Sequence, residues 1–370
     1  MRPFLKAAAA CLACLPMGCD WGGVAKDIGY QVGEHMLGSE RGMLFYAYDT
    51  LAYPGEPVDL VARLQSAREM PGSSGLKGLG GAVLGFYRDG ERIGQAETDD
   101  DGHARIAWTP PRKGDYAFEV RILEPPRKEE YEHAPELEPA PLLVSARKRD
   151  AELAIVDLDH TVVDSGFFRV LMGGARPMSG AAPVLDQIDD RYTLVYLTQR
   201  PNILTRKSKQ WLAEHDFPRG VLLLSELKDV FDSGKFKTAR IKSLRESYPN
   251  VALGIGDKLS DAQAYVDNGM QAYLIPRYDR DDAEDVEKMA REVRRLKGRG
   301  RLHVVDDWSQ IDSGVFQRRS YPPDRYARGL ELRANTLRAE KRAREREERR
   351  REKSEDDEDD DDEDDDEEDD

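Results

Sequence analysis

The chain has 370 residues, enough for two or three domains. Its net charge of −16 arises from residues 355–370, which are all acidic; the rest of the chain holds equal numbers of acidic and basic side chains. This balance argues against a nucleic-acid-binding protein, which needs surplus Lys and Arg to neutralise phosphates. Every apolar run is shorter than the ~20 residues of a membrane-spanning helix.

The N-terminus has the pattern of an export signal. A positively charged start precedes the short apolar stretch 7–15, and the only cysteines are Cys11, Cys14 and Cys19. Gly18 before Cys19 makes the segment resemble a bacterial lipoprotein signal, although Pro16 replaces the usual Leu. The resemblance implies a signal peptide over 1–18 and a lipid on Cys19.

Lipidation would place the protein outside the cytoplasm, anchored in the cell envelope with the membrane as its partner. Several acyl chains anchor stably, at about 0.8 kcal/mol for each buried CH₂. A folded part without cysteine also suits an oxidising compartment. The alternatives are an ordinary signal peptide or a buried N-terminal helix. The Gly-rich residues 19–41 are expected to form a tether.

Residues 42–123 carry the pattern of an all-β sandwich. Short runs with partial alternation are separated by turn residues, and Asp89-Gly90 is a strong hairpin signal. The stretch 90–120 resembles bacterial immunoglobulin-like domains, which implies an immunoglobulin-like fold. Residues 124–141 contain five prolines among charges and are expected to be a linker. A strand at 142–145 would extend the sandwich to 147.

From residue 148 to 318 the pattern becomes α/β. Five apolar runs without alternation are separated by helix-like stretches; the runs are 153–156, 193–197, 221–224, 251–255 and 272–275. This arrangement predicts a Rossmann-like parallel sheet with helices on both faces. Residues 319–353 are expected to form a charged helix, and 354–370 a disordered acidic tail.

Chemically useful side chains follow the ends of these predicted strands, where ligands bind in open α/β sheets. They are Asp157, Asp159, Thr161, Thr198, Asp257 and Asp261, together with Lys235 or Lys237 at the start of a helix. Such a set suits phosphoryl transfer to a carboxylate: one Asp attacks phosphorus, a second handles the proton, and a hydroxyl and an ammonium hold the phosphate oxygens. Clustered carboxylates are also ligands for Mg²⁺.

These motifs, in this order, resemble the haloacid dehalogenase superfamily of phosphatases. The resemblance implies that Asp157 is the nucleophile and Asp159 the general acid/base, and that Thr198 and a lysine bind phosphate. It also implies an Mg²⁺ ion held by Asp157, the backbone carbonyl of Asp159, Asp257 and Asp261. Lys237 fits the family's Lys-x-x-x-Ile pattern through Ile241, with Lys235 as the alternative.

Residues 151–278 are also similar to the lipin-type domain of phosphatidate phosphatases and phosphatidylinositol-transfer proteins. The similarity rests on Tyr196–Arg200, Pro218–Leu223, Lys235-Phe236-Lys237 and Gly256-Asp257-Lys258. His160 departs from the Gly that is usual in active members.

The intervals between motifs leave no room for a large capping domain, so a bulky substrate is expected. The leading hypothesis is a Mg²⁺-dependent phosphatase acting on a phosphatidate-like lipid. The alternatives are a phosphatase for phosphoprotein or glycan, and a non-catalytic, membrane-tethered phospholipid-binding protein.

Overall fold

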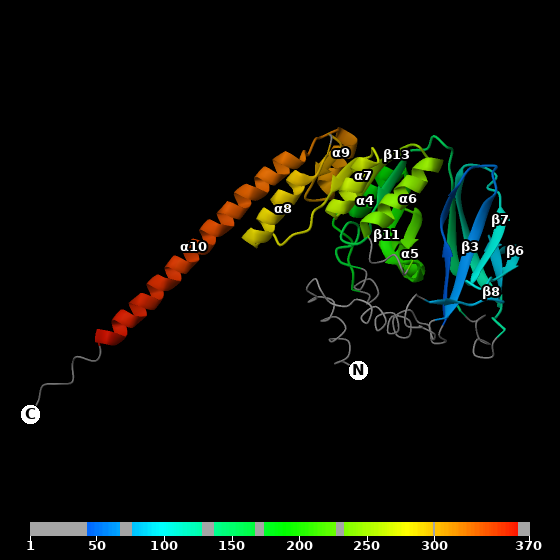
Figure 1. Cartoon of the computed structure of the whole chain (residues 1–370), viewed down its shortest axis with the longest axis horizontal. Coiled ribbons are helices and arrows are strands. Elements are labelled where there is room, and N and C mark those ends of the chain that lie inside the picture. Colours follow the sequence, from blue (N-terminus) through cyan, green and yellow to red (C-terminus); the bar gives the residue numbers. More distant parts are fainter. Residues whose placement is uncertain are drawn as a thin grey trace, which may run out of the picture. The chain divides into compact units, whose positions relative to one another are not determined.

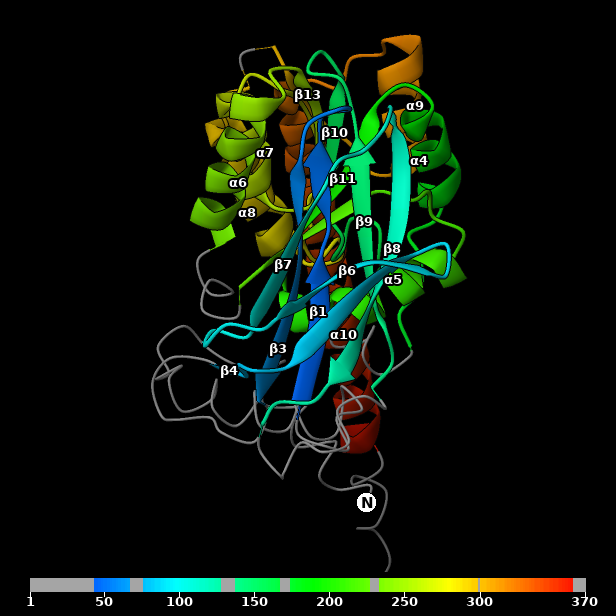
Figure 2. The ribbon, with the colours of Figure 1, turned by 90° about the vertical axis from the view of Figure 1, so that its right-hand side faces the viewer.

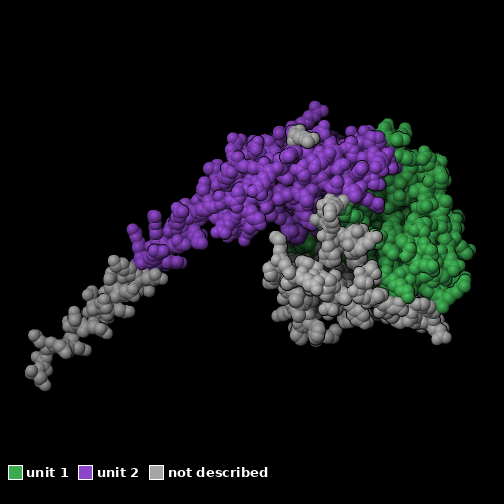
Figure 3. All heavy atoms as spheres, in the orientation of Figure 1, with its two compact units in different colours: residues 1–151, 165–176, 193–236 green, residues 152–164, 177–192, 237–370 purple. Residues whose placement is uncertain are grey.

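The structure is a computed structural model of the chain, and it describes residues 43–66, 76–127, 137–166, 174–226, 233–298 and 300–361 (Figure 1). The predicted signal peptide, tether and Cys19, and the end of the acidic tail, lie outside these residues. The chain divides into two compact units (Figure 3). The first comprises residues 1–151, 165–176 and 193–236, and the second 152–164, 177–192 and 237–370.

The N-terminal part of the first unit is an all-β fold of two sheets around one core. One sheet contains β1 (Met43–Tyr48), β3 (Val58–Ser66), β4 (Lys77–Gly78) and β7 (His103–Trp108). The other has the order β2 (Thr50–Ala52), β9 (Ala140–Ala146), β8 (Gly114–Glu124), β5 (Val83–Arg88) and β6 (Glu91–Glu97). Figure 2 shows β7 beside β3 and β8 beside β9, and both pairs are antiparallel. The predicted all-β region is confirmed.

The sequence explains most of this fold. β8 alternates, so that Tyr116, Phe118, Val120 and Ile122 lie in the core while their neighbours face outward. The β5–β6 turn has positive φ at Asp89 (50°) and Gly90 (84°), as a two-residue hairpin with the strands' right-handed twist requires.

The strand expected at 142–145 is present and is longer than predicted. β9 begins at Ala140, inside the predicted linker, and pairs with β8 from Ala140 to Ala146. The all-β fold therefore extends to residue 146. The short strands β2 and β4 were not predicted, because two or three residues carry no alternation that could be recognised.

The α/β part contributes parallel strands to both units. In the first unit, β11 (Thr193–Pro201) pairs in parallel with β12 (Val221–Ser225), next to the 3₁₀ turn η4 (Asn202–Leu204) and α5 (Thr205–Glu214). In the second, β10 (Leu153–Val156), β13 (Val251–Gly256), β14 (Gln271–Leu274) and β15 (Leu302–Val304) pair in parallel in that order. β10 is buried along its whole length, as a strand covered on both faces should be.

Helices cover both faces of the second unit's sheet. They are α4 (Ala181–Asp189), α6 (Ser233–Ser247), α7 (Leu259–Asp267), α8 (Ala283–Arg295) and α9 (Trp308–Gln317). Figure 2 shows α6, α7 and α8 on one side and α4 and α9 on the other. The predicted α/β fold is confirmed.

The last helix, α10, runs from Pro323 to Asp361. Its first half packs beside α8, with ion pairs from Arg294 to Glu331 and from Arg338 to Glu287, and its second half extends away from the sheet (Figure 1). The helix continues eight residues past the predicted end at 353, into the acidic segment. Among the described residues, no helix combines the length and the apolarity needed to cross a membrane.

A buried carboxylate holds the sandwich and the α/β strands of the first unit together. Asp49, at the β1–β2 junction, has a fully buried side chain. It accepts hydrogen bonds from the backbone N–H groups of Leu143 (2.7 Å) on β9 and Leu222 (3.0 Å) on β12. Its Oδ1 also lies 2.5 Å from Nζ of Lys209 on α5. One side chain thus joins three elements that are far apart in sequence.

We expect Asp49→Ala to destabilise the protein by about 2–4 kcal/mol, because it leaves a partly buried ammonium and two buried N–H groups without their acceptor. The shift of the first urea-unfolding transition measures this loss. The exposed Asp59→Ala on β3 is the matched control and should change stability by less than about 0.5 kcal/mol. Equal stability of the two variants would contradict this role for Asp49.

Candidate active site

Three buried carboxylates meet in the second unit. Asp157 follows β10, Asp257 follows β13, and Asp261 lies in the first turn of α7. One carboxylate oxygen from each lies within 4.8 Å of the others. The first two meet because β10 and β13 are neighbouring parallel strands, with Val156 opposite Ile255, so that both strands end at the same edge.

Lys237 on α6 supplies the positive charge of this cluster. Its side chain is 1% exposed, and its Nζ lies 2.8 Å from Oδ1 of Asp157 and 2.5 Å from Oδ2 of Asp261. Burial lowers the pKa of the ammonium, but the two carboxylates outweigh burial and raise that pKa above its usual value. The ammonium therefore stays charged and offsets part of the negative charge.

One ammonium does not compensate three carboxylates. Burial, followed by repulsion from Asp157 and Asp261, raises the pKa of Asp257 to about 7. Burial also raises the pKa of Asp261, against the lowering effect of Lys237. Oδ1 of Asp257 and Oδ1 of Asp261 are buried without a hydrogen-bond partner among the described residues.

Glycines allow the close approach of α7 to β13. A Cβ on Gly254 would lie 2.3 Å from the ring of Tyr265, and a Cβ on Gly256 would lie 3.2 Å from Cβ of Asp261. Asp261 stands in the first turn of α7, where the helix dipole favours an acidic side chain. The Gly-Asp motif thus combines a ligand with the space that the helix needs.

The loop after β10 presents the second predicted catalytic carboxylate. Asp159 is half-buried and lies outside the buried cluster of three. His160 has φ of 59°, in the left-handed region that favours glycine. The backbone at this position therefore has a conformation that suits the Gly expected there, although the residue is His. Trp308 fixes this loop by donating a hydrogen bond from Nε1 to the carbonyl of Thr161 (2.9 Å).

Sequence reasoning missed two residues near the carboxylates. Tyr265 is fully buried against Gly254, and its hydroxyl donates to the carbonyl of Ile255 (3.4 Å). Arg277, in the loop after β14, is 56% exposed and places NH1 3.8 Å from Oδ2 of Asp257. A basic side chain shortly after the predicted strand 272–275 was the available signal for Arg277.

The remaining predicted residues are placed as follows. Thr198 is buried on β11 in the first unit, where its Oγ1 accepts a hydrogen bond from the N–H of Arg200 (3.3 Å). Its approach to the carboxylates of the second unit stays a prediction. Lys235 lies in the first turn of α6, and its side chain is outside the described part. The lysine that contacts the carboxylates is Lys237.

The buried cluster fits a divalent cation. Its donors are all carboxylate oxygens, which hard cations such as Mg²⁺ prefer, and two of them have no other partner among the described residues. Asp157, Asp257 and Asp261 would hold the ion. A bound cation would also supply the positive charge that Lys237 alone does not provide.

A comparison with protein families bears on this part of the chain. Residues 154–275, about a third of the sequence, match the family model described as "PITM 1-3, LNS2 domain". This domain is of lipin type and is related to the haloacid dehalogenase phosphatases. The match supports a phosphatase or phospholipid-related function for the segment that carries the three carboxylates and Lys237.

Solved structures resemble parts of the chain only weakly. The CARDB domain of a Pyrococcus furiosus protein is 13% identical with a TM-score of 0.20, and the match covers 28% of this chain and 94% of that one. The D0-D1 domain of intimin is 15% identical with a TM-score of 0.19, over 28% and 46%. A chain of the Pnkp1/Rnl/Hen1 RNA repair complex is 13% identical with a TM-score of 0.31, over 38% and 50%. The comparison with curated proteins found no match.

The raised pKa of Asp257 predicts how stability changes with pH in the absence of metal. An unfolded Asp titrates near 3.9, so between about pH 4 and the folded pKa of about 7 the folded chain binds more protons than the unfolded chain. This group therefore reduces stability as pH rises through that window. We expect Asp257→Asn to raise the free energy of unfolding at pH 8 by on the order of 1–3 kcal/mol, with little gain at pH 4.

Thermal unfolding with EDTA and with Mg²⁺ measures the effect of Asp257 on stability and its contribution to metal binding. Mg²⁺ should raise the unfolding midpoint of the parent but not that of Asp257→Asn. Asp186→Asn, on the exposed face of α4, is the matched control and should behave as the parent does. If Asp257→Asn is no more stable than the parent at pH 8, the proposed charge balance is contradicted. If Mg²⁺ raises its unfolding midpoint as much as that of the parent, the proposed metal site is contradicted.

Proposed function

We propose that the protein is a Mg²⁺-dependent phosphomonoesterase that works through an aspartyl-phosphate, with a phosphatidate-like lipid as substrate at the cell envelope. The observation that carries the proposal is the buried group of Asp157, Asp257 and Asp261 beside Lys237, with two carboxylate oxygens lacking partners among the described residues. The LNS2 match supports the lipid-related class of substrate.

Asp157 is the proposed nucleophile in the first half of the reaction. Its carboxylate oxygen attacks phosphorus, the ester P–O bond breaks, and Asp159 donates a proton to the departing alkoxide. Lys237, 2.8 Å from Asp157, is close enough to the nucleophile to hold an oxygen of the transferring phosphoryl group. Thr198 is proposed as a second phosphate-binding group.

The second half restores the enzyme. Asp159, now a carboxylate, takes a proton from water as the water oxygen attacks phosphorus, and the bond between phosphorus and Asp157 breaks to release phosphate. When bound, Mg²⁺ would offset repulsion between the anionic nucleophile and the anionic substrate. Arg277 is an exposed cation beside Asp257 and is suited to draw anions toward the site.

We expect Asp157→Asn to reduce phosphate release from phosphatidate by roughly three orders of magnitude or more, because an amide is a poor nucleophile. Replacing the nucleophile of other enzymes has effects of this size. The measurement is phosphate release from mixed micelles with Mg²⁺ and with EDTA. Asp190→Asn, at the exposed end of α4, is the matched control and should retain activity.

The same assay distinguishes the alternatives. Turnover of an aryl phosphate but not of phosphatidate would favour a phosphatase for phosphoprotein or glycan. Binding to phosphatidate vesicles without turnover of any phosphomonoester would favour a non-catalytic phospholipid-binding protein. Full phosphatase activity of Asp157→Asn would contradict the role of Asp157 as the nucleophile.

Membrane attachment through Cys19 is the other part of the proposal. A lipid on this residue would keep the enzyme near a membrane substrate and so raise the effective concentration of the two. Cys19→Ser should move the protein from the membrane fraction to the soluble fraction and leave turnover of a soluble aryl phosphate unchanged. Fractionation after expression in a bacterial host measures this, with Cys14→Ser as the control. A Cys19→Ser protein that stays in the membrane fraction would contradict lipidation.

A further inference from the structure

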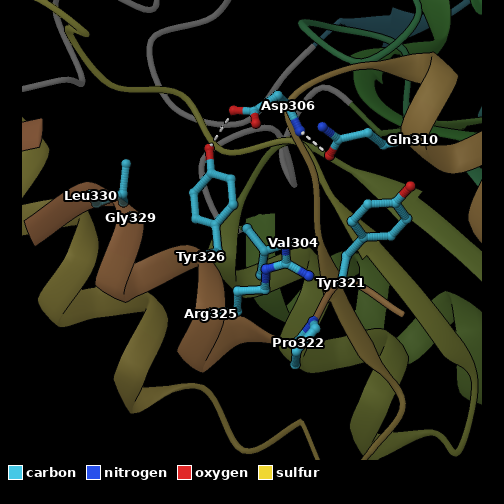
Figure 4. Close-up of a pocket in the computed structure, with 9 residues that line it drawn as sticks. All are labelled: Val304, Asp306, Gln310, Tyr321, Pro322, Arg325, Tyr326, Gly329 and Leu330. Atoms are coloured by element: carbon cyan, nitrogen blue, oxygen red, sulfur yellow. Dashed lines mark hydrogen bonds between the residues drawn. The ribbon is translucent and has the colours of Figure 1, made fainter. Parts of the chain in front are cut away.

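A pocket lies in the second unit, between the carboxyl end of β15 and the start of α10 (Figure 4). Its volume is about 320 Å³, within the size range of small-molecule sites. The residues that line it are Val304, Asp306, Gln310, Tyr321, Pro322, Arg325, Tyr326, Gly329 and Leu330.

The pocket opens at the same sheet edge as the carboxylate cluster. Gly256 pairs with Leu274, and Leu274 pairs with Val304, so these three residues stand in one row across β13, β14 and β15. At ~4.8 Å between strands, the floor of the pocket is roughly 10 Å from Gly256, the residue before Asp257. Carboxyl ends of parallel strands are where α/β proteins place ligands.

The pocket holds one negative and one positive side chain, and each can still form an ion pair or hydrogen bond with a ligand. Oδ1 of Asp306 accepts a hydrogen bond from the hydroxyl of Tyr326 (3.0 Å) and lies 3.6 Å from NH2 of Arg280. Within the described chain, its Oδ2 makes no hydrogen bond. The guanidinium of Arg325 has neither an ion pair nor a hydrogen bond to any described residue, and it is exposed.

Hydrogen bonds hold Asp306 and the residues around it in place. Tyr326 is fixed at its hydroxyl by Asp306 and by the hydroxyl of Tyr278, 3.2 Å away. Gln310 accepts from the N–H of Asp306 (3.1 Å) through Oε1, which leaves its amide Nε2 as a donor. Figure 4 shows Asp306 and Gln310 at one end of the pocket and Arg325 near Pro322 toward the other.

We propose that this pocket binds a small zwitterion, with its ammonium at Asp306 and its phosphate or carboxylate at Arg325. An anion would pair with Arg325 and leave Oδ2 of Asp306 without a donor, whereas a zwitterion reaches both groups; the Oδ1 side of Asp306 already faces Arg280. Such a group occurs in ethanolamine phospholipid headgroups and in soluble molecules. The site is separate from Asp157 and does not depend on the proposed phosphatase activity.

The test uses a ligand that a phosphomonoesterase cannot hydrolyse. Glycerophosphoethanolamine, a zwitterionic phosphodiester, is titrated calorimetrically into the full chain carrying Cys19→Ser, with EDTA present. Glycerophosphoglycerol lacks the ammonium, and ethanolamine lacks the phosphate. Asp306→Asn and Arg325→Gln change the pocket, while Asp312→Asn on α9 and Arg328→Gln on α10 are matched controls outside it.

We expect saturable binding of glycerophosphoethanolamine that weakens tenfold or more in either pocket variant and stays unchanged in the controls. Both variants alter exposed groups and should unfold at the temperature of the parent, which verifies that they fold. No saturable binding at 10 mM ligand, approximately the limit for a weak site, would overturn the proposal. So would equal binding of either singly charged ligand, or equal binding by the pocket variants.

Vesicles then identify the source of the zwitterion. Phosphatidylglycerol vesicles with and without phosphatidylethanolamine are sedimented with the parent and with Arg325→Gln. Greater recovery on ethanolamine-containing vesicles, lost in the variant, would assign the site to lipid headgroups. Calorimetric binding without that difference would assign it to a soluble zwitterion.

Discussion

The repulsion among Asp157, Asp257 and Asp261 is the constraint on which the rest of the second unit depends. Like charges in a buried space separate unless the fold holds them, and here Lys237 offsets only part of the negative charge. The surrounding structure holds the three carboxylates close together. Adjacent parallel strands hold the first two residues, glycines on β13 bring α7 close, and Trp308 fixes the loop that follows Asp157. Burial, followed by repulsion from Asp157 and Asp261, raises the pKa of Asp257.

The first unit uses a buried carboxylate in the opposite way. Asp49 is also fully buried, but Lys209 and two backbone N–H groups satisfy it, so its charge is compensated within the fold. A similar junction lies nearby, where Glu226 receives hydrogen bonds from Arg63 on β3 and from Asn202. These polar contacts tie the sandwich to β12, α5 and η4 and make the all-β part integral to its unit. Asp49, with all its partners within the fold, stabilises the first unit. The carboxylate cluster of the second unit is only partly paired and can still bind a ligand.

Sequence reasoning found the carboxylates because two strong regularities coincide. Continuous apolar runs identify buried parallel strands, and the residue that follows each run lies at the ligand-binding edge. That logic located Asp157 and Asp257 without coordinates. It did not find Arg277 or the pocket near Asp306, because their approach depends on where loops and the start of α10 return to the sheet, which no local pattern encodes. The strand β9 was partly missed since the prolines before and within it favour a linker, although pairing with β8 outweighs that local preference.

The charge balance also bears on whether catalysis is retained. A site that only bound phospholipid headgroups would need cations, because phosphate is anionic. Three buried acidic side chains oppose that role, since they repel a phosphate unless a divalent ion lies between them. The raised pKa of Asp257 means that this carboxylate reduces stability of the metal-free protein above about pH 4. Nucleophilic attack and metal binding both use carboxylates at this position, so the cluster suits the proposed phosphatase and also a site that binds phosphate through a metal ion.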